Sequence, residues 1–314
     1  MLLKSYGGDA DLAKRLLASF EKFNHEGLSL YVVVPEADVP RFEELGGANV
    51  HVLPETAFGD YLVDHPVAGV RPGYINQEIV KLAFWELGLA ENYFCVDSDA
   101  VFVRPFGRDD FMLDATTPYT VLVEDNELKV EPRYYAQHWQ GREAHLRRIQ
   151  ELVDLDDRRI LTCHGHQVMS STVLRSLKSD FLQPKSWTYA DMLAEAPYEF
   201  SWYNFWLQKT QIIPIAVREP LVKTFHHEGQ HLEYALRGIG PDDIARGFVG
   251  VVVNSNYARS WADGDASEAP EETLARYVPA RVLAKALALQ ASGPLRRRIT
   301  TRQDGESAGG AADA

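Results

Sequence analysis

The sequence has few cysteines and no long apolar run. Its 314 residues contain two cysteines, Cys95 and Cys163, which are too few for a disulfide scaffold or a cysteine-based zinc site. No stretch of 18 apolar residues occurs, which argues against a membrane-spanning helix, and the opening residues lack the apolar core of a signal peptide. We therefore expect a cytoplasmic protein with two reduced, buried thiols, and leave peripheral association with a membrane through a partner open.

Positive charge is also scarce. Lys and Arg total 32 against 45 Asp and Glu, so the formal net charge is −13. A surface this acidic repels phosphate backbones, which argues against binding to nucleic acid or to an anionic membrane. A phosphorylated small ligand can still bind if a metal ion bridges it to the protein. The hydrophobic content of 46% excludes disorder over most of the chain.

Short apolar strands alternate with amphipathic helices in the first hundred residues. Residues 28–34 form a β-branched run ended by Pro35, which is typical of a strand buried on both faces. Further strands are expected at 50–53, 93–96 and 100–103, and helices at 9–20, 40–45 and 77–87. This alternation predicts an α/β fold with a mostly parallel sheet. Residues 54–76 are rich in Pro and Gly and predict a long, functional loop.

The second half of the chain is less regular at first. Residues 107–160 mix aromatic and basic side chains and are interpreted as an insertion or as an acceptor-side region. Helices are then expected at 171–177, 187–195, 200–209 and 271–290, and strands at 211–217 and 248–253. Four aromatic residues lie in the third of these helices or just before it: Tyr198, Trp202, Tyr203 and Trp206. Aromatic residues at helical spacing are more often part of the core, so a core role is favoured over a stacking wall for an acceptor sugar.

Asp97-Ser98-Asp99 directly follows a predicted buried strand. Open α/β sheets bind ligands beyond the carboxyl ends of their strands, so both carboxylates are expected in that crevice. Hard oxygen ligands of this kind suit Mg²⁺ or Mn²⁺, which bridge one or two carboxylates to substrate phosphates. The alternative is a purely structural role, in which the segment is a polar turn and its Asp side chains cap backbone amides. The placement between two extended apolar segments favours the metal site.

The string YFCVDSDAVFVRPF resembles the metal-binding D-x-D signature of the GT-A-fold nucleotide-sugar glycosyltransferases. The chain is more narrowly similar to a bacterial group of glycosyltransferase-like proteins. That group shares a Gly-aromatic-x-x-Gln-x-x-x-Lys helix, matched here by residues 73–81. Four other stretches look similar as well: TCHGHQVMSSTVLRSL, EFSWYNFWL, KTFHHEGQHLEYA and GFVGVVVNSNYA. The resemblance spans residues 3–262.

The resemblance implies a GT-A domain over residues 1–262. A helical extension over 263–293 and a disordered tail over 294–314 complete the expected organisation. It further implies that Asp99 ligates Mn²⁺ or Mg²⁺ directly, with Asp97 binding through water or holding the ribose. The residues expected to contact the donor are Ser5, Tyr6, Gln77, Lys81, Asp97, Ser98 and Asp99.

Two further roles come from the same resemblance. A histidine near the end of the domain supplies a third metal ligand in many GT-A enzymes, and His226 is favoured over His227 because it follows Phe225. Glu199 is the first choice for the catalytic base that deprotonates the acceptor. The position where some relatives carry an acid after the Ser holds Trp202 here, so an N-cap role for Glu199 or Ser201 stays open. His164 and His166 border the acceptor pocket in the related group.

The resulting expectation is a metal-dependent, hexosyltransferase-like enzyme. It transfers a sugar from a nucleotide-diphospho-sugar, with a UDP-sugar as default, to a glycan or other hydroxyl acceptor in cell-surface glycan or secondary glycoconjugate synthesis. One alternative is a haloacid-dehalogenase-type phosphatase with Asp97 as nucleophile and Asp99 as acid/base, because residues 97–101 also satisfy D-x-D-x-[TV]. Another is a carbohydrate-binding protein that kept the GT-A fold without turnover.

Overall fold

The chain divides into two compact units. The computed structural model describes residues 1–163, 165–254 and 279–291. The first unit comprises Met1–Thr224 and Gly247–Val252, and the second comprises Phe225–Arg246 and the chain from Val253 onward. Every predicted site residue except His226 and its alternative His227 belongs to the first unit.

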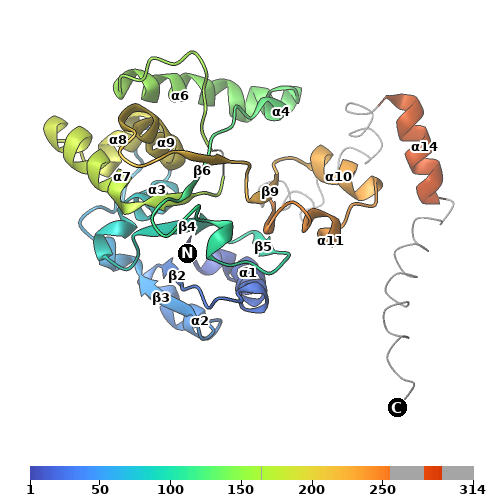
Figure 1. The fold of residues 1–314 in the computed structure, drawn as a ribbon, viewed down its shortest axis with the longest axis horizontal. Helices are drawn as coiled ribbons and strands as arrows, with labels where there is room; N and C mark the ends of the chain where they lie inside the picture. The colour runs from blue at the N-terminus through green and yellow to red at the C-terminus, as the bar shows by residue number, and fades with distance from the viewer. Residues whose placement is uncertain (164, 255–278, 292–314) are drawn as a thin grey trace. The chain divides into compact units, whose positions relative to one another are not determined.

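A five-stranded sheet of order β3-β2-β1-β4-β7 organises the first unit (Figure 1). Its strands are β1 (Leu2–Lys4), β2 (Leu30–Val34), β3 (Val50–Pro54), β4 (Asn92–Val96) and β7 (Val168–Ser170). The first four run parallel to their neighbours, and β7 pairs antiparallel with β4. The prediction of an α/β fold with a mostly parallel sheet is therefore confirmed.

The remaining strands form two small sheets. One has the order β5-β10-β9, and the other pairs β6 with β8 in parallel. Their bounds are β5 (Ala100–Phe102), β6 (Tyr119–Val121), β8 (Ala216–Arg218), β9 (Val222–Phe225) and β10 (Gly250–Val253). The strand predicted over 211–217 was wrong for most of its length. Gln211 adopts a left-handed conformation with φ 47°, which ends the preceding helix and delays the strand.

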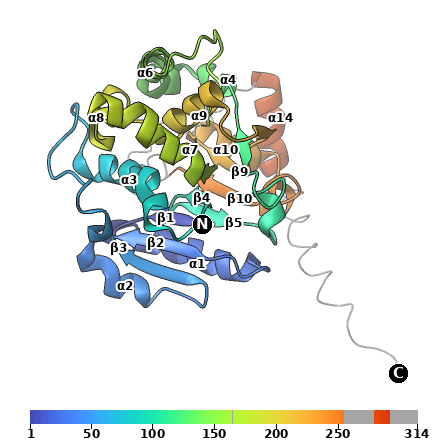
Figure 2. The same ribbon diagram turned by 60° about the vertical axis from the view of Figure 1, so that its left-hand side comes forward.

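The central sheet is buried on both faces, because successive residues of a strand point to opposite sides. Leu3, Val32 and Phe94 belong to a core with α1 (Ala10–Phe23) and Phe42 of α2 (Val39–Glu43). Leu2, Val33 and Cys95 belong to a second core with three helices on the other face (Figure 2). These helices are α3 (Pro72–Ala83), α7 (Ser171–Ser176) and α9 (Glu199–Thr210). This two-sided burial explains the uninterrupted apolar run in β2.

Helix α3 begins earlier than predicted. The expected start was Gln77, but the helix starts at Pro72, and a 3-10 turn at Glu55–Phe58 further shortens the predicted loop. Proline fits the first helical turn, where its missing N–H has no intrahelical acceptor to lose. The helix continues into a 3-10 turn and ends at Gly88, whose φ of 67° suits glycine. As a consequence, Tyr74, Gln77, Glu78 and Lys81 all lie on one helix.

The segment predicted to be irregular contains short helices. They are α4 (Asn126–Lys129), α5 (Pro132–Tyr134), a π-helical turn (Tyr135–Trp139) and α6 (Gln140–Leu152). Helix α6 buries Arg142, Leu146 and Ile149, which share one face at a spacing of four and three residues. Helix α8 (Tyr189–Glu195) packs beside α3 and α6 and has a capping box formed by Thr188 and Asp191.

The second unit contains α10 (Glu228–Leu236), α11 (Pro241–Ile244) and α14 (Ala280–Ala291). Helix α14 lies inside the range predicted as a helical extension, whereas the predicted tail over 294–314 lies outside the described residues. The domain boundaries stay predictions. No helix in the described part of the chain is long and apolar enough to cross a bilayer. Both cysteines are buried free thiols, as expected.

Candidate active site

The Asp97–Asp99 segment is a tight turn at the carboxyl end of β4. The Ala100 amide donates to the Asp97 carbonyl over 3.0 Å, closing the turn before β5 begins. Ser98 is buried, while Asp97 and Asp99 are half-buried. The sequence prediction that this motif follows a buried strand is therefore confirmed.

Lys81 connects Asp97 to Glu199. Its Nζ donates to Asp97 Oδ1 and to Glu199 Oε1, each over 3.0 Å, and its side chain is 3% exposed. Gln77, one turn earlier on α3, donates its Nε2 to the same Asp97 oxygen over 3.4 Å. Two predicted residues, Asp97 after a strand and Glu199 at a helix start, therefore contact the Lys81 ammonium, and Gln77 lies beside them.

The charges in this cluster stabilise one another. Burial alone would lower the pKa of Lys81, but the carboxylates of Asp97 and Glu199 raise this pKa well above its ordinary value. Burial would raise the pKa of Asp97, whereas the Lys81 ammonium, with a smaller contribution from His166, lowers it. Lys81 is therefore a cation and Asp97 an anion at neutral pH.

His166 belongs to the same cluster. It precedes β7, which runs antiparallel to β4, so the chain enters β7 at the carboxyl end of β4. Its Nε2 lies 3.6 Å from Asp97 Oδ2, and both ring nitrogens are buried without a hydrogen-bond partner. Burial lowers the pKa of His166, which favours the neutral imidazole. The other histidine of this stretch, His164, lies outside the described residues.

Ser5 and Ser98 join the ends of two neighbouring strands. Their hydroxyl oxygens are 2.9 Å apart and both side chains are buried. Tyr6 follows with 41% of its surface exposed. A Cβ on Gly8 would lie 2.4 Å from the Tyr6 ring, so glycine leaves room for this ring position. The structure thus brings the predicted Ser5 and Ser98 together beside an exposed aromatic ring.

Glu78 was missed by the sequence reasoning. It is 2% exposed, and its Oε2 has no hydrogen-bond partner. Burial and the negative charge of Glu199 raise its pKa well above the ordinary value, which favours the neutral carboxylic acid. Glu78 follows Tyr74 by four residues and precedes Lys81 by three, so these three side chains share one face of the helix. This spacing was the signal in the sequence that could have identified Glu78 as a site residue.

Arg142 and its surroundings were also missed. The guanidinium of Arg142 stacks over the Tyr198 ring, with 4.2 Å from Cζ to the ring centroid, and lies 5.8 Å from the Trp139 ring. Asp125 is near enough to influence it electrostatically, and burial raises the pKa of Asp125 to about 6. Arg142 occupies an apolar-face position of α6, and that register was the only sequence signal for its burial.

The aromatic residues of α9 divide between core and site. Trp202 and Tyr203 are fully buried, and Trp206 is 8% exposed, so a stacking wall built on these three is wrong. Trp202 Nε1 donates to the Ala196 carbonyl over 2.8 Å, and the Tyr203 hydroxyl accepts from the Ser170 amide. The helix begins at Glu199 with Tyr198 as its N-cap and no side-chain cap, so the N-cap role considered for Glu199 or Ser201 is also wrong.

The sequence matches a family model. Residues 3–236 match the model described as a family of unknown function, DUF6492. The chain belongs to the DUF6492 family. The matched range contains every predicted site residue from Ser5 to His226. No curated protein matches the chain.

Several solved structures resemble this DUF6492 member. Mouse xyloside xylosyltransferase 1 in its apo form aligns at 10% identity and a TM-score of 0.47, covering 81% of this chain and 97% of its own. The apo WbbM bifunctional glycosyltransferase aligns at 12% identity and 0.46, covering 91% of this chain and 51% of its own. The galactosyltransferase LgtC, with donor and acceptor sugar analogues, aligns at 9% identity and 0.39, covering 80% and 85%.

The predicted third metal ligand lies in the second unit of this DUF6492 member. His226 follows β9, and its amide donates to Gln230 Oε1 over 2.9 Å. Its role, like that of His227, stays a prediction. Within residues 1–163, 165–254 and 279–291, no group of three or more His, Cys, Asp or Glu side chains is arranged to hold a metal ion.

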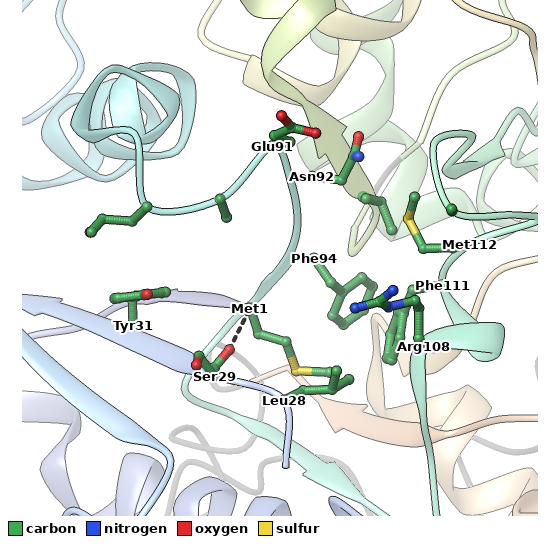
Figure 3. Close-up of a pocket in the computed structure, with 14 residues that line it drawn as sticks. Met1, Leu28, Ser29, Tyr31, Glu91, Asn92, Phe94, Arg108, Phe111 and Met112 are labelled. Atoms are coloured by element: carbon green, nitrogen blue, oxygen red, sulfur yellow. Dashed lines mark hydrogen bonds between the residues drawn. The ribbon is translucent and has the colours of Figure 1, made fainter. Parts of the chain in front are cut away.

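A cavity of about 320 Å³ lies at the opposite, amino ends of the strands (Figure 3). Met1 and Ser29 line it just before β1 and β2, and Asn92 lines it at the start of β4. Figure 3 shows Phe94, Phe111 and Arg108 grouped beside Met1. None of the predicted site residues lines this cavity.

Proposed function

We propose that this chain is a glycosyltransferase of the GT-A fold. It would transfer a sugar from a nucleotide-diphospho-sugar, with a UDP-sugar as default donor, to an acceptor hydroxyl. One observation carries the proposal: the buried Lys81 ammonium is shared by Glu199 and by Asp97, which directly follows the carboxyl end of the parallel strand β4. Buried charges are costly, so a cluster of them where α/β sheets bind ligands indicates a functional site.

The residues present fit a divalent cation. Mg²⁺ and Mn²⁺ need only one or two protein carboxylates when substrate phosphates complete their coordination, so a three-residue cluster is not required. The Asp97 side chain is 34% exposed, and its Oδ2 is the oxygen that Lys81 and Gln77 do not contact. Asp97 and Asp99 would hold the ion, with His226 as the proposed third ligand. The bound ion would neutralise charge on the leaving nucleoside diphosphate.

Side chains of the protein would bind the nucleoside, orient the donor and accept the proton of the acceptor hydroxyl. Ser5, Ser98 and Tyr6 would bind the nucleoside, with the exposed Tyr6 ring available for stacking on the base. Lys81 and Gln77 would orient the donor, because an ammonium and an amide can donate to phosphate or sugar oxygens. The bond from the anomeric carbon to the phosphate oxygen breaks, and the acceptor oxygen bonds to that carbon. Glu199 would take the proton that the acceptor hydroxyl loses.

The phosphatase alternative is not favoured. A haloacid-dehalogenase-type enzyme expects its nucleophilic Asp on the first strand and a later acidic pair at a strand end. Here the motif follows β4, and Asp242 and Asp243 lie within helix α11. Asp97 is also already engaged by Lys81.

A thermal-shift screen of nucleotide sugars with and without Mn²⁺ tests the proposal. A ligand that binds the folded state raises the melting temperature by mass action. We expect at least one nucleotide sugar to stabilise the protein only with Mn²⁺, and to be converted with release of its nucleoside diphosphate. Asp99→Ala should lose both effects. Phosphate release from monoesters would instead support the phosphatase, and Mn²⁺-dependent binding without turnover would support a non-catalytic protein.

A further inference from the structure

Three cationic side chains are buried in the part of the chain that the structure describes. Lys4 and Arg142 are each 9% exposed, and Lys81 is 3% exposed. Lys4 pairs with Glu55 over 2.9 Å, and Lys81 pairs with Asp97 and Glu199. Arg142 has neither an ion pair nor a hydrogen bond with any described residue, and its Nε is fully enclosed without a partner. A buried charge without a partner is costly, so its retention calls for a ligand.

The contacts of Arg142 hold its guanidinium without engaging its hydrogen-bonding groups. Its guanidinium is held by aromatic rings, with Tyr198 at 4.2 Å and Trp139 at 5.8 Å. The two carboxyl groups that it influences, Glu78 and Asp125, form no ion pair with it. Burial and the negative charge of Glu199 raise the pKa of Glu78 well above its ordinary value, which disfavours its anionic form. The aromatic stack therefore orients a guanidinium whose hydrogen-bonding groups are unused.

Arg142 contacts the residue that precedes Glu199 and does not contact the donor motif. Tyr198, on which it stacks, directly precedes Glu199, and Glu199 in turn contacts Lys81 and through it Asp97. Arg142 influences Glu78, Tyr74 and Asp125 electrostatically, whereas the principal charges acting on Asp97 are Lys81 and His166. A group bound at Arg142 would therefore lie next to the proposed base and away from the diphosphate.

We propose that Arg142 binds an anionic group, a carboxylate or a phosphate, on the acceptor substrate. A guanidinium matches both groups, because its planar fork donates two parallel hydrogen bonds. The assignment to the acceptor rests on the proposed function, whereas the anion site itself can be measured without turnover. In a protein with a net charge of −13, a single exposed cation would not attract such a substrate, but an enclosed and pre-oriented guanidinium would.

Direct binding measurements test this proposal. Glucuronate, glucose 6-phosphate and glucose are titrated into the protein at constant ionic strength in a buffer free of phosphate and carboxylate. We expect one or both anionic sugars to bind at least tenfold more tightly than glucose, and the stronger of the two identifies the group. Arg142→Gln should lose at least tenfold in affinity for that sugar, which corresponds to about 1.4 kcal/mol, and should leave glucose binding unchanged.

The matched control removes the same charge from the same helix. Arg148 lies on α6 at the surface, paired with Glu195 over 2.9 Å, so Arg148→Gln should change the affinity by less than about twofold. Arg142→Lys keeps the positive charge but lacks the planar guanidinium with its two parallel donors, so it should bind the anionic sugar with an affinity between those of wild type and Arg142→Gln. If Arg142→Gln does not fold, the comparison of Arg142→Lys with wild type tests the proposal.

Three outcomes would overturn the proposal. The first is equal affinity of the wild type for anionic sugars and for glucose. The second is an equal loss of affinity for the anionic sugar in Arg142→Gln and Arg148→Gln. The third, if Arg142→Gln does not fold, is an Arg142→Lys variant that binds the anionic sugar as tightly as wild type. If anionic sugars bind through Arg142 but no nucleotide sugar binds with Mn²⁺, the proposed function fails while the anion site stands.

Discussion

The two ends of the central sheet differ in kind. At the carboxyl ends, Lys81, Asp97 and Glu199 come from separate segments and form a buried charged cluster. At the amino ends, a cavity of about 320 Å³ is lined mainly by apolar and neutral side chains. Burial lowers the pKa of the Met1 ammonium in this cavity to about 5, whereas the cluster contains side chains whose pKa values are shifted both by burial and by one another. For locating a reaction, the costly charges are the better guide.

Lys81→Met should have the largest effect at the charged end. It leaves the carboxylates of Asp97 and Glu199 close together without their cation. We expect the free energy of unfolding to fall by about 3 kcal/mol, because removing one partner of a buried pair strands the other. Urea denaturation at pH 7 measures this change. Adding Glu199→Gln should restore part of the loss by removing the less exposed of the two stranded charges.

An exposed ion pair offers the control for Lys81→Met. Lys209 contacts Asp154 over 2.7 Å, with 37% and 93% of the two side chains exposed. Lys209→Met should therefore cost no more than about 1 kcal/mol. If the two Met variants lose equal stability, the carboxyl-end cluster is no different from a surface ion pair and the comparison fails.

Glu78→Gln should have a smaller effect that depends on pH. Burial and Glu199 raise the folded-state pKa of Glu78 above its ordinary value of 4.5, so the folded protein keeps a proton that the unfolded chain releases. The stability contributed by this group is therefore present below about pH 4.5 and is lost as the pH rises. Relative to wild type, the Gln variant should gain stability from pH 5 to pH 8.

Denaturation midpoints at several pH values measure that gain. Glu151, 68% exposed on α6, supplies the control, and Glu151→Gln should show a difference from wild type that does not change with pH. A difference in stability between Glu78→Gln and wild type that stays constant from pH 5 to pH 8 would mean that the pKa of Glu78 is not raised in the folded protein.

Arg108→Gln should have the smallest effect, because it changes the amino-end cavity. Arg108 lines that cavity, and its backbone amide, which the substitution keeps, donates to Glu26 over 2.7 Å. We expect a stability change within about 0.5 kcal/mol and unchanged affinity for the nucleotide sugar found in the thermal-shift screen. A tenfold loss of that affinity would assign the donor to the amino end and reverse the comparison.

The order of strands and the position of the D-x-D turn were predictable from local patterns. The apolar run of β2 and the YFCV segment of β4 specify buried strands, and the carboxyl end of a parallel strand specifies where Asp97 lies. The start of α3 was not found, because Pro72 was interpreted as part of a loop when it occupies the first turn of a helix. Proline is compatible with a loop and with the first turn of a helix, so the residues around it determine which of the two forms.

The contacts within the site were less predictable. Lys81 and Glu199 are 118 residues apart, and only the packing of α3 against α9 brings them together. Glu78 and Arg142 are polar residues in apolar register, a pattern that also describes solvated helix faces when the helix bounds are uncertain. Single-sequence reasoning identified the residue types that carry charge but could not show which charges are enclosed.

Calorimetric titration of UDP with Mn²⁺ into wild type and Asp99→Asn tests the central claim most directly. The account predicts that wild type binds UDP only when Mn²⁺ is present. It predicts that Asp99→Asn loses at least tenfold in affinity, or about 1.4 kcal/mol, while its melting temperature without ligand is unchanged. Equal Mn²⁺-dependent affinity in the two proteins would contradict the metal-dependent donor site at the carboxyl end of β4.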